Sequence, residues 1–373
     1  HLCHRHRNGD RRWSHSSVVL ITAFPLSPIN QIQDSGNLLQ VQGLQVFLKQ
    51  RNRRLTVVED LNFSLGFGER LGIVGESGCG KSVTALALLN LLPSTMNMAG
   101  SIHLASRDGQ TEDLNQLSEA RLCEIRGKKI GMVFQEPMSA LNPVQTIGHQ
   151  VSESLLLHHS LSRHEADQKA SRMLDRVGLP DSRFARKLYP HQLSGGQRQR
   201  VVIAIAMACG PDLLIADEPT TALDVTIQAQ ILRLLSELVE EEKMSLILIT
   251  HDLGVIAENT DRMLVMYAGR CVESGLTEDV FSKLKHPYTR GLFEALPEGE
   301  QQHKGRSTRL KTIPGRVPKL DERSRGCVFQ TRCASVQPRC REEVPQWVES
   351  DLQHSWACWF PHEAQPVLSS HER

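Results

Sequence analysis

The sequence predicts an α/β protein built around a parallel sheet, and three stretches support this prediction. Residues 70–74 form an apolar run that leads into a glycine-rich loop and then into a helix-like stretch, residues 83–92. That order is typical of a strand followed by a helix. Two further apolar runs, residues 212–216 and 246–249, end just before polar residues. Continuous apolar runs of this length are typical of buried parallel strands, so we expect all three in the sheet.

Length and composition place the chain among ordinary globular proteins. It has 373 residues, is 40% hydrophobic and 23% charged, and has a formal net charge of +1. The length corresponds to two domains at about 100–200 residues each. The balance of charges argues against bulk nucleic acid as the main partner. The longest apolar run, residues 201–209, is much shorter than the roughly 20 residues of a spanning helix, so we expect the chain not to cross a membrane by itself.

The chain divides into three expected parts. Residues 1–36 begin with His and contain few periodic apolar residues, so we interpret them as a disordered extension or a misplaced start. Residues 37–290 contain the strands and helices. Alternating apolar residues over 39–48, followed by two shorter runs, predict a small antiparallel subdomain at roughly 37–68. In residues 291–373 Gly and Pro recur and no long helix or strand is evident, which predicts a loop-rich C-terminal region.

The glycine-rich loop fits the phosphate-binding pattern G-x-x-x-x-G-K-[ST] at every fixed position. Its backbone N–H groups and the N-terminus of the following helix form a site for an anion. Lys81 is expected to reach the β- and γ-phosphates of a nucleotide, and the Ser82 hydroxyl to ligate Mg²⁺. Cys79 is interpreted as a small filler at a variable position. The expected nucleotide-binding residues here are Gly75, Glu76, Ser77, Gly78, Cys79, Gly80, Lys81, Ser82 and Val83.

Two acidic residues, Asp217 and Glu218, follow the apolar run at residues 212–216. A carboxylate at the end of a buried strand can hold the Mg²⁺ shell, directly or through water. The adjacent glutamate can orient the attacking water or accept its proton. Such a pair is common on its own, but together with the phosphate loop it indicates a nucleoside triphosphatase. We therefore expect Asp217 at the metal and Glu218 as the catalytic base.

A Leu-Ser-Gly-Gly-Gln stretch at residues 193–197 precedes a helix-like run. By physics alone, Ser-Gly-Gly at a helix start is a further anion-binding cap. The order of the motifs along residues 37–290 resembles the ATP-binding cassette (ABC) family. In that resemblance the stretch is the family signature, Gln135 the Q-loop glutamine, Asp224 the end of the D-loop, and His251 the switch histidine. The signature residues are Ser194, Gly195, Gly196 and Gln197.

The resemblance implies a mechanism in which two cassettes pack head to tail and sandwich each ATP. Lys81 acts on the chain's own nucleotide, whereas the signature acts on the nucleotide of the partner. His251 is expected to donate to the γ-phosphate, and Gln135 to sense Mg²⁺ and the attacking water. An aromatic residue near the first strands stacks on adenine in this family. Phe47 is the candidate, with a role in the core as the alternative.

Two classes of ABC protein compete, a transporter subunit and a soluble ATPase that acts on DNA or ribosomes. The interval between Lys81 and Ser194 shows no sustained heptads, the chain has one cassette, and no basic stripe stands out. These features favour the transporter. Several stretches also resemble the oligopeptide, dipeptide and nickel importer group. They are residues 75–78, 134–143, 286–290, 313–315 and 326–333.

This second resemblance implies the partners. They are two membrane permease subunits, a second, paralogous ATPase chain and an extracytoplasmic solute-binding protein, with no nucleic acid. The chain is expected at the cytoplasmic face of the inner membrane, as a peripheral subunit. Residues 136–192 are rich in helix formers and form the helical subdomain that contacts the permeases. The solute stays open among dipeptides, longer peptides and nickel or a metal chelate.

Four of the nine cysteines fall near the end of the chain: Cys327, Cys333, Cys340 and Cys358. Four thiolates suit a [4Fe–4S] cluster, which accepts irregular spacing. They also suit zinc, although the C-x₂₋₄-C pair common in zinc sites is absent. Free or loosely paired thiols are the third alternative. The importer resemblance implies an iron–sulfur site, with a structural or regulatory role because these residues lie far in sequence from the ATP chemistry.

Overall fold

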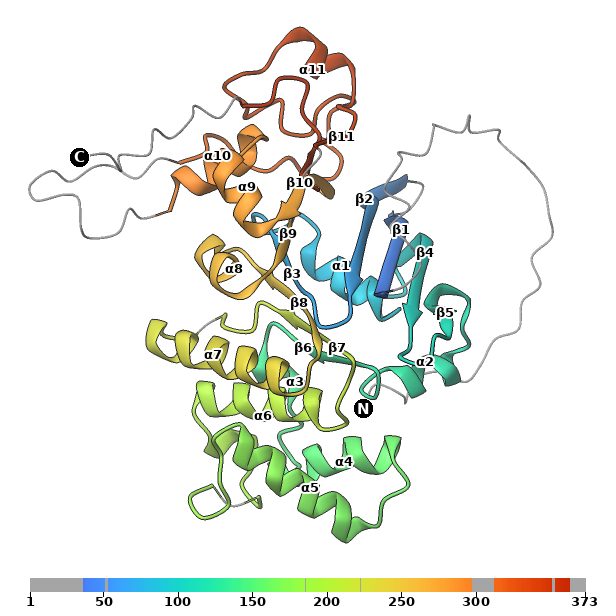
Figure 1. Ribbon diagram of the computed structural model, residues 1–373, viewed down its shortest axis with the longest axis vertical. Helices are drawn as coiled ribbons and strands as arrows, with labels where there is room; N and C mark the ends of the chain where they lie inside the picture. The colour runs from blue at the N-terminus through green and yellow to red at the C-terminus, as the bar shows by residue number, and fades with distance from the viewer. Residues whose placement is uncertain are drawn as a thin grey trace, which may run out of the picture.

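The computed structural model describes most of the chain, and it confirms the α/β fold. It describes residues 36–50, 53–184, 186–221, 223–296, 312–350 and 353–362. The predicted N-terminal extension, apart from residue 36, lies outside the described residues. Two sheets, one of four and one of eight strands, lie between a helical lobe at one end and the C-terminal region at the other (Figure 1).

The larger sheet carries the phosphate loop. Its strands are β3 (Arg70–Val74), β6 (Ile130–Val133), β7 (Leu213–Asp217), β8 (Ser245–Thr250), β9 (Arg262–Tyr267), β10 (Arg270–Leu276), β11 (Val348–Glu349) and β12 (Ser355–Trp356). Their spatial order is β11-β12-β10-β9-β3-β8-β7-β6, and the run from β9 to β6 pairs in parallel. The three predicted apolar strands are thus β3, β8 and β7, side by side. Their carboxyl ends meet at one edge, where the site lies.

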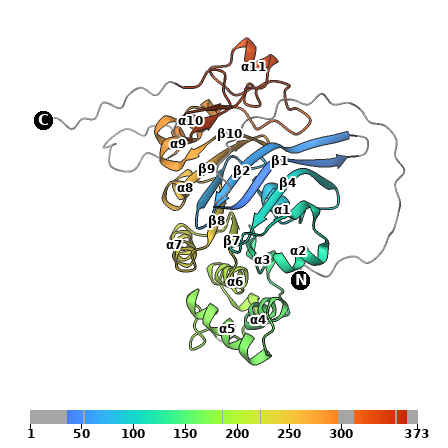
Figure 2. The same cartoon turned by 45° about the vertical axis from the view of Figure 1, so that its right-hand side comes forward.

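The smaller sheet is antiparallel and larger than expected. Its strands are β1 (Asn37–Gln50), β2 (Arg53–Gly66), β4 (Met96–Ala105) and β5 (Thr111–Asp113), in the order β2-β1-β4-β5 (Figure 1). Figure 2 shows β2, β1 and β4 side by side. The two short strands expected before residue 68 are one strand, β2. The sequence pattern breaks at Asp60, which has a φ of 48°, and there the pairing of β1 with β2 shifts in register. This bulge explains why one strand resembled two.

The helical lobe follows the sheet strand β6. It contains α3 (Pro137–Ala140), α4 (Ile147–His158), α5 (Arg163–Arg176), the 3₁₀ turn η2 (Pro190–Gln192) and α6 (Gly195–Met207). Ser162 begins α5 with a capping box, because its hydroxyl accepts from the Glu165 N–H and the Glu165 carboxylate accepts from the Ser162 N–H. The predicted helical segment at residues 136–192 therefore matches the structure, with α6 completing the lobe (Figure 1).

The remaining helices lie around the sheets, except α11, which lies within the C-terminal region (Figure 1). They are α1 (Lys81–Leu88), α2 (Glu119–Ile125), α7 (Val225–Glu241), α8 (Leu253–Asn259), α9 (Thr277–Lys283), α10 (Pro287–Glu294), α11 (Pro338–Glu342) and the 3₁₀ turn η1 (Leu114–Gln116). Helix α1 begins two residues before the predicted start and ends at Leu88 rather than Leu92. Asn90 adopts a φ of 52°, which stops the helix before Pro93. Among the described residues, no helix has the length and apolarity needed to cross a membrane.

The C-terminal region is joined to the cassette rather than separate from it. Strand β12 pairs antiparallel with β10 and so extends the larger sheet. The expected boundary near residue 290 falls inside α10. The buried Cys327 and Phe329 belong to the same hydrophobic cluster as Val272 and Tyr288 of the cassette. The C-terminal region therefore packs onto the cassette through shared core.

Candidate functional site

The phosphate loop connects β3 to α1 and depends on close backbone packing. A Cβ at Gly75 would lie 2.2 Å from the Met266 carbonyl oxygen in β9, so only glycine fits there. Gly80 adopts a φ of 105° directly before α1, a conformation that glycine reaches without strain. Cys79 is fully buried, as its interpretation as a filler requires, and burial raises the pKa of its thiol.

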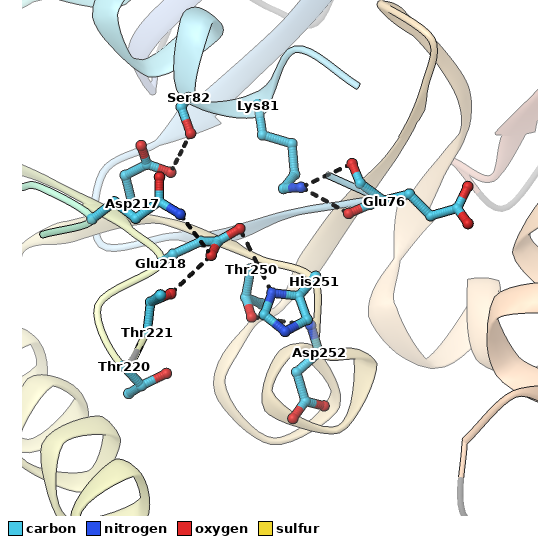
Figure 3. A network of polar contacts seen from close by, with 12 residues as sticks. Glu76, Lys81, Ser82, Asp217, Glu218, Thr220, Thr221, Thr250, His251 and Asp252 are labelled. Carbon is cyan, nitrogen blue, oxygen red and sulfur yellow. Dashed lines mark hydrogen bonds and ion pairs between the residues drawn. The ribbon is translucent and has the colours of Figure 1, made fainter. Parts of the chain in front are cut away.

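Lys81 lies across the loop with little exposure to solvent. Its side chain is 4% exposed, and Nζ donates to the carbonyl oxygens of Gly75 at 2.7 Å and Glu76 at 3.3 Å (Figure 3). The ammonium group therefore lies over the concave side of the loop, where a nucleotide's phosphates would be. This is the position that the sequence pattern predicts for a phosphate-binding lysine.

Ser82 and Asp217 form the candidate magnesium site. Ser82 Oγ, in the first turn of α1, donates to Asp217 Oδ1, at the end of β7, over 3.1 Å (Figure 3). Asp217 is 4% exposed, and this burial raises the pKa of its carboxyl group, although the Ser82 hydrogen bond opposes the shift. A hydroxyl and a buried carboxylate are hard oxygen ligands of the kind that Mg²⁺ prefers. The donor set therefore fits a magnesium ion.

Glu218 is held by residues from three separate motifs. Its Oε2 accepts from Gln135 Nε2 at 3.1 Å and from Thr221 Oγ1 at 2.8 Å, and His251 Nδ1 lies 3.6 Å from Oε1 (Figure 3). Its backbone N–H donates to the Ile249 carbonyl in β8. The φ of Glu218 is 44°, an uncommon conformation for a non-glycine residue. Such strain gathers at functional sites, where the surrounding structure imposes it.

The sequence placed Thr221 in a motif but did not predict its contact with Glu218. Thr221 lies in the stretch that resembles the D-loop, and its hydroxyl fixes one carboxylate oxygen of Glu218. The hydroxyl at this place, three residues after the glutamate, is the signal that could have identified it. Asp224, at the end of the same stretch, caps α7 by accepting from the Ile227 N–H at 3.0 Å.

The signature residues lie at the start of α6, away from the phosphate loop. Ser194 is the N-cap, its Oγ accepts from the Gln197 N–H, and the Gln197 amide oxygen accepts from the Ser194 N–H. A Cβ at Gly196 would lie 2.7 Å from Ile227, so the glycine permits α6 to approach α7. Within the described part of the chain, no hydrogen bond or ion pair joins residues 194–197 to the phosphate loop.

Phe47, the candidate for adenine stacking, lies in β1 and is 6% exposed. The guanidinium carbon of Arg54 is 3.2 Å from the centre of its ring, a cation–π contact. One face of the ring is therefore already covered. A nucleotide base would stack on that face only after Arg54 moved away.

The four C-terminal cysteines converge on one cavity. Cys327, Cys333, Cys340 and Cys358 all line it, together with aromatic residues, and its volume is about 10 Å³. None of the four forms a disulfide. Burial raises the pKa of the Cys327 and Cys333 thiols and raises that of Cys358 to about 12. Among the described residues, no three His, Cys, Asp or Glu side chains are arranged to hold a single metal ion.

Comparison with known proteins assigns the chain to a family. The family profile described as ABC transporter matches residues 58–221, and the profile described as oligopeptide/dipeptide transporter, C-terminal region, matches residues 272–340. A putative peptide import ATP-binding protein of Brucella melitensis is 48% identical over 325 residues, which cover 86% of this chain and 96% of the relative. The chain belongs to the ABC transporter family. Its activity as an ATP-hydrolysing subunit is confirmed by that membership.

Further relatives and solved structures agree with this ABC assignment. A probable peptide ABC transporter ATP-binding protein of Sinorhizobium fredii is 46% identical over 328 residues, covering 87% of this chain and 96% of the relative. A dimeric ATP-binding cassette in a post-hydrolysis state, bound to ADP and Pi, has a TM-score of 0.56 and 28% identity. The match covers 64% of this chain and 98% of that cassette. The predicted ABC cassette fold is thereby confirmed.

Proposed function

We propose that this ABC subunit hydrolyses ATP to drive uptake of peptides. The observation that carries the proposal is the combination of an intact phosphate site with a C-terminal region of the oligopeptide/dipeptide transporter type. Relatives at 46% and 48% identity are described as peptide import or peptide ABC transporter proteins. This supports a peptide as the solute over nickel or a metal chelate, and over a soluble ATPase that acts on DNA or ribosomes.

The proposed mechanism assigns each residue a task at the γ-phosphate. Ser82 and Asp217 would hold Mg²⁺, which would supply positive charge beside the phosphates. Lys81 binds the β- and γ-phosphates and Glu218 accepts the proton of the attacking water. Gln135 and His251 both contact or approach Glu218, so they can orient this water and the γ-phosphate. Because the chemistry is mainly positioning and charge stabilisation, no covalent intermediate is needed.

A head-to-tail pair of cassettes would complete the site. Ser194 and Gly196 lie at an exposed helix N-terminus whose N–H groups suit a phosphate. They do not contact the phosphate loop of their own chain, which supports a role on the nucleotide of a partner. A structurally similar cassette is described as dimeric. We propose a second, paralogous ATPase chain as this partner, with Asp224 at the junction between the two chains.

The remaining partners follow from the importer assignment. We propose two membrane permease subunits, contacted through the helical lobe at residues 136–192, and an extracytoplasmic solute-binding protein. The chain would then lie at the cytoplasmic face of the inner membrane. Phe47 is proposed to stack on adenine after Arg54 leaves its ring.

A strain that lacks the gene tests the proposed solute directly. Wild-type protein should restore uptake of a radiolabelled di- or oligopeptide. Lys81→Ala should not, because the phosphates lose the ammonium group that binds them. Affinity purification of the wild-type chain from membranes should recover permeases and a second ATPase chain. Restoration of nickel uptake without peptide uptake would contradict the proposed solute.

We also propose a [4Fe–4S] cluster at the four cysteines. Their thiols line one cavity, and four thiolates suit a cluster of this kind. The cavity of about 10 Å³ holds about one water molecule, so the loops around it must open to admit a cluster. Iron is ligated by thiolates, so binding of a cluster to these thiols would release protons.

Iron analysis of anaerobically purified protein tests the cluster. Wild type should be brown and contain about four iron atoms per chain. Cys327→Ser should lose most of this iron, whereas Cys209→Ser, which changes a half-buried thiol outside the cavity, should keep it. Colourless wild-type protein without iron would overturn this part of the proposal.

A further inference from the structure

Glu76, the second residue of the phosphate loop, is held by the C-terminal region. Its carboxylate forms a two-pronged ion pair with Arg332, in which Arg332 Nη2 lies 3.0 Å from Oε1 and Nη1 contacts Oε2. The Arg332 side chain is only 4% exposed. The two residues are separated by 256 positions in the sequence, so this contact links the loop to the far end of the chain.

The rest of the Arg332 guanidinium is fixed as well. Nε donates to the Pro314 carbonyl at 2.8 Å, Nη2 to the Ile313 carbonyl at 3.3 Å, and Nη1 to Tyr267 Oη at 3.4 Å. A planar guanidinium with its donors engaged on several sides has one orientation. Arg332 therefore presents its charge to Glu76 in a defined direction.

The backbone of Glu76 is anchored by a helix of the cassette. Its N–H donates to Tyr288 Oη, in α10, at 2.8 Å. The rings of Tyr288 and Tyr267 are 4.6 Å apart, and both pack against Phe329, three residues before Arg332. This aromatic cluster therefore joins the phosphate loop to both the cassette and the C-terminal region.

The geometry also separates the Glu76 charge from the phosphates. Figure 3 shows the Glu76 carboxylate pointing away from Lys81, while the Glu76 carbonyl accepts from Lys81 Nζ. A carboxylate in a loop that binds a triphosphate would otherwise repel it. Arg332 both neutralises this carboxylate and keeps it turned outward.

We propose that Arg332 is a positioning residue that strengthens the binding of ATP. It does so by holding the Glu76 carboxylate away from the triphosphate site. The proposal rests on ATP binding at this loop, as proposed above, and adds a residue from the C-terminal region to that site. Since Cys333 directly follows Arg332, the same segment borders both the four-cysteine cavity and the phosphate loop. The C-terminal region thus has a direct role in nucleotide affinity.

Equilibrium binding of ATP to the full chain tests the proposal. Arg332→Met keeps most of the side-chain volume but removes the charge. It should raise the Kd for ATP about tenfold, the order expected for one uncompensated charge near a triphosphate. The double variant Arg332→Met/Glu76→Gln removes both charges and should return the Kd to within about threefold of wild type. Arg316→Met is the matched control, because Arg316 belongs to the same region but forms an exposed ion pair, and its Kd should match wild type.

A purely structural role for Arg332 gives a different result. It would lower the melting temperature and the active fraction, but leave the Kd of the folded protein unchanged, or give a loss that Glu76→Gln does not restore. Either result overturns the proposal. Should Arg332→Met fail to fold, Arg332→Gln replaces it with the same expected loss and rescue, and failure of both to fold assigns Arg332 to structure alone. Absence of ATP binding by wild type would instead refute the proposed function.

Discussion

The phosphate site and the four-cysteine region are held in place by different means. Asp217 and Glu218 follow a buried parallel strand, and Lys81 and Ser82 open a helix, so backbone hydrogen bonds set their positions. The four-cysteine region has little regular structure: α11 has five residues, and β11 and β12 have two each. Backbone pairing of β12 with β10 and buried side-chain contacts attach it to the cassette. The comparison teaches that regular elements set the positions of the ATP-site residues, whereas the loop-built region depends on a few buried contacts.

The two regions meet at two buried polar contacts. Arg332 joins the C-terminal region to Glu76 of the phosphate loop, and His354 joins it to Glu273 of β10. In the second pair both side chains are fully buried, and His354 Nε2 lies 2.8 Å from Glu273 Oε1. Each pair links a residue of the loop-rich region to a residue of the sheet or the loop that follows a strand. Substitutions in the ATP site should therefore impair hydrolysis, whereas substitutions at these contacts should weaken the attachment of the C-terminal region.

The largest effect is expected from a substitution in the ATP site. Glu218→Gln keeps the hydrogen-bond geometry but removes the proton acceptor, so kcat for ATP should fall at least about 100-fold. The Kd for ATP should change little, because Lys81 and the loop amides bind the phosphates. Steady-state hydrolysis and equilibrium binding of the same preparation measure both quantities.

A matched glutamate controls for the Glu218 experiment. Glu237 lies on the exposed face of α7, and Glu237→Gln should leave kcat unchanged. Steady hydrolysis by Glu218→Gln at the wild-type rate would remove Glu218 from the role of base. The contrast between the ATP site and the C-terminal region would then lose its chemical basis.

A substitution at the contact between β10 and the C-terminal region should have a smaller effect on turnover but a large effect on stability. Glu273 accepts from the N–H groups of Lys285 and His286, each at 2.8 Å, besides its pair with His354. Glu273→Ala leaves these buried donors without a partner, and should destabilise the protein by about 3–5 kcal/mol. Thermal unfolding measures this loss.

The control for Glu273 is an exposed pair in the same region. Arg339 and Glu343 are about half exposed, so Glu343→Gln should cost at most about 1 kcal/mol. Equal melting temperatures for Glu273→Ala and Glu343→Gln would show that the buried pair does not attach the C-terminal region.

Most of the ATP site could be predicted from sequence because its parts are contiguous. Neighbouring residues specify each local structure: the loop that contains Lys81, the strand that ends at Asp217 and the cap at Ser194. The expectation that Gln135 and His251 act at the same γ-phosphate as Glu218 came from the resemblance to the ABC family. The hydrogen bonds from Gln135 and Thr221 needed the structure, because the spacing along the chain does not fix which side chain reaches the carboxylate.

The contacts between distant segments could not be predicted. The large separation in sequence suggested that the cysteine region was remote from the ATP chemistry, yet Arg332 contacts the phosphate loop itself. Likewise, β4 and β5 join a sheet that the sequence limited to residues 37–68. Both arise from long-range packing, for which a local pattern carries no signal. The contacts of Arg332 with Glu76 and of His354 with Glu273 could likewise be seen only in the folded chain.

The most direct measurement is ATP turnover by the complex purified from membranes and reconstituted in vesicles with its solute-binding protein. Addition of peptide should raise the hydrolysis rate several-fold in wild type and leave Glu218→Gln without turnover. This result would join the ATP site to peptide import in one assay. Turnover by wild type that is indifferent to peptide, or an active ATPase that recovers no membrane partner, would contradict the account.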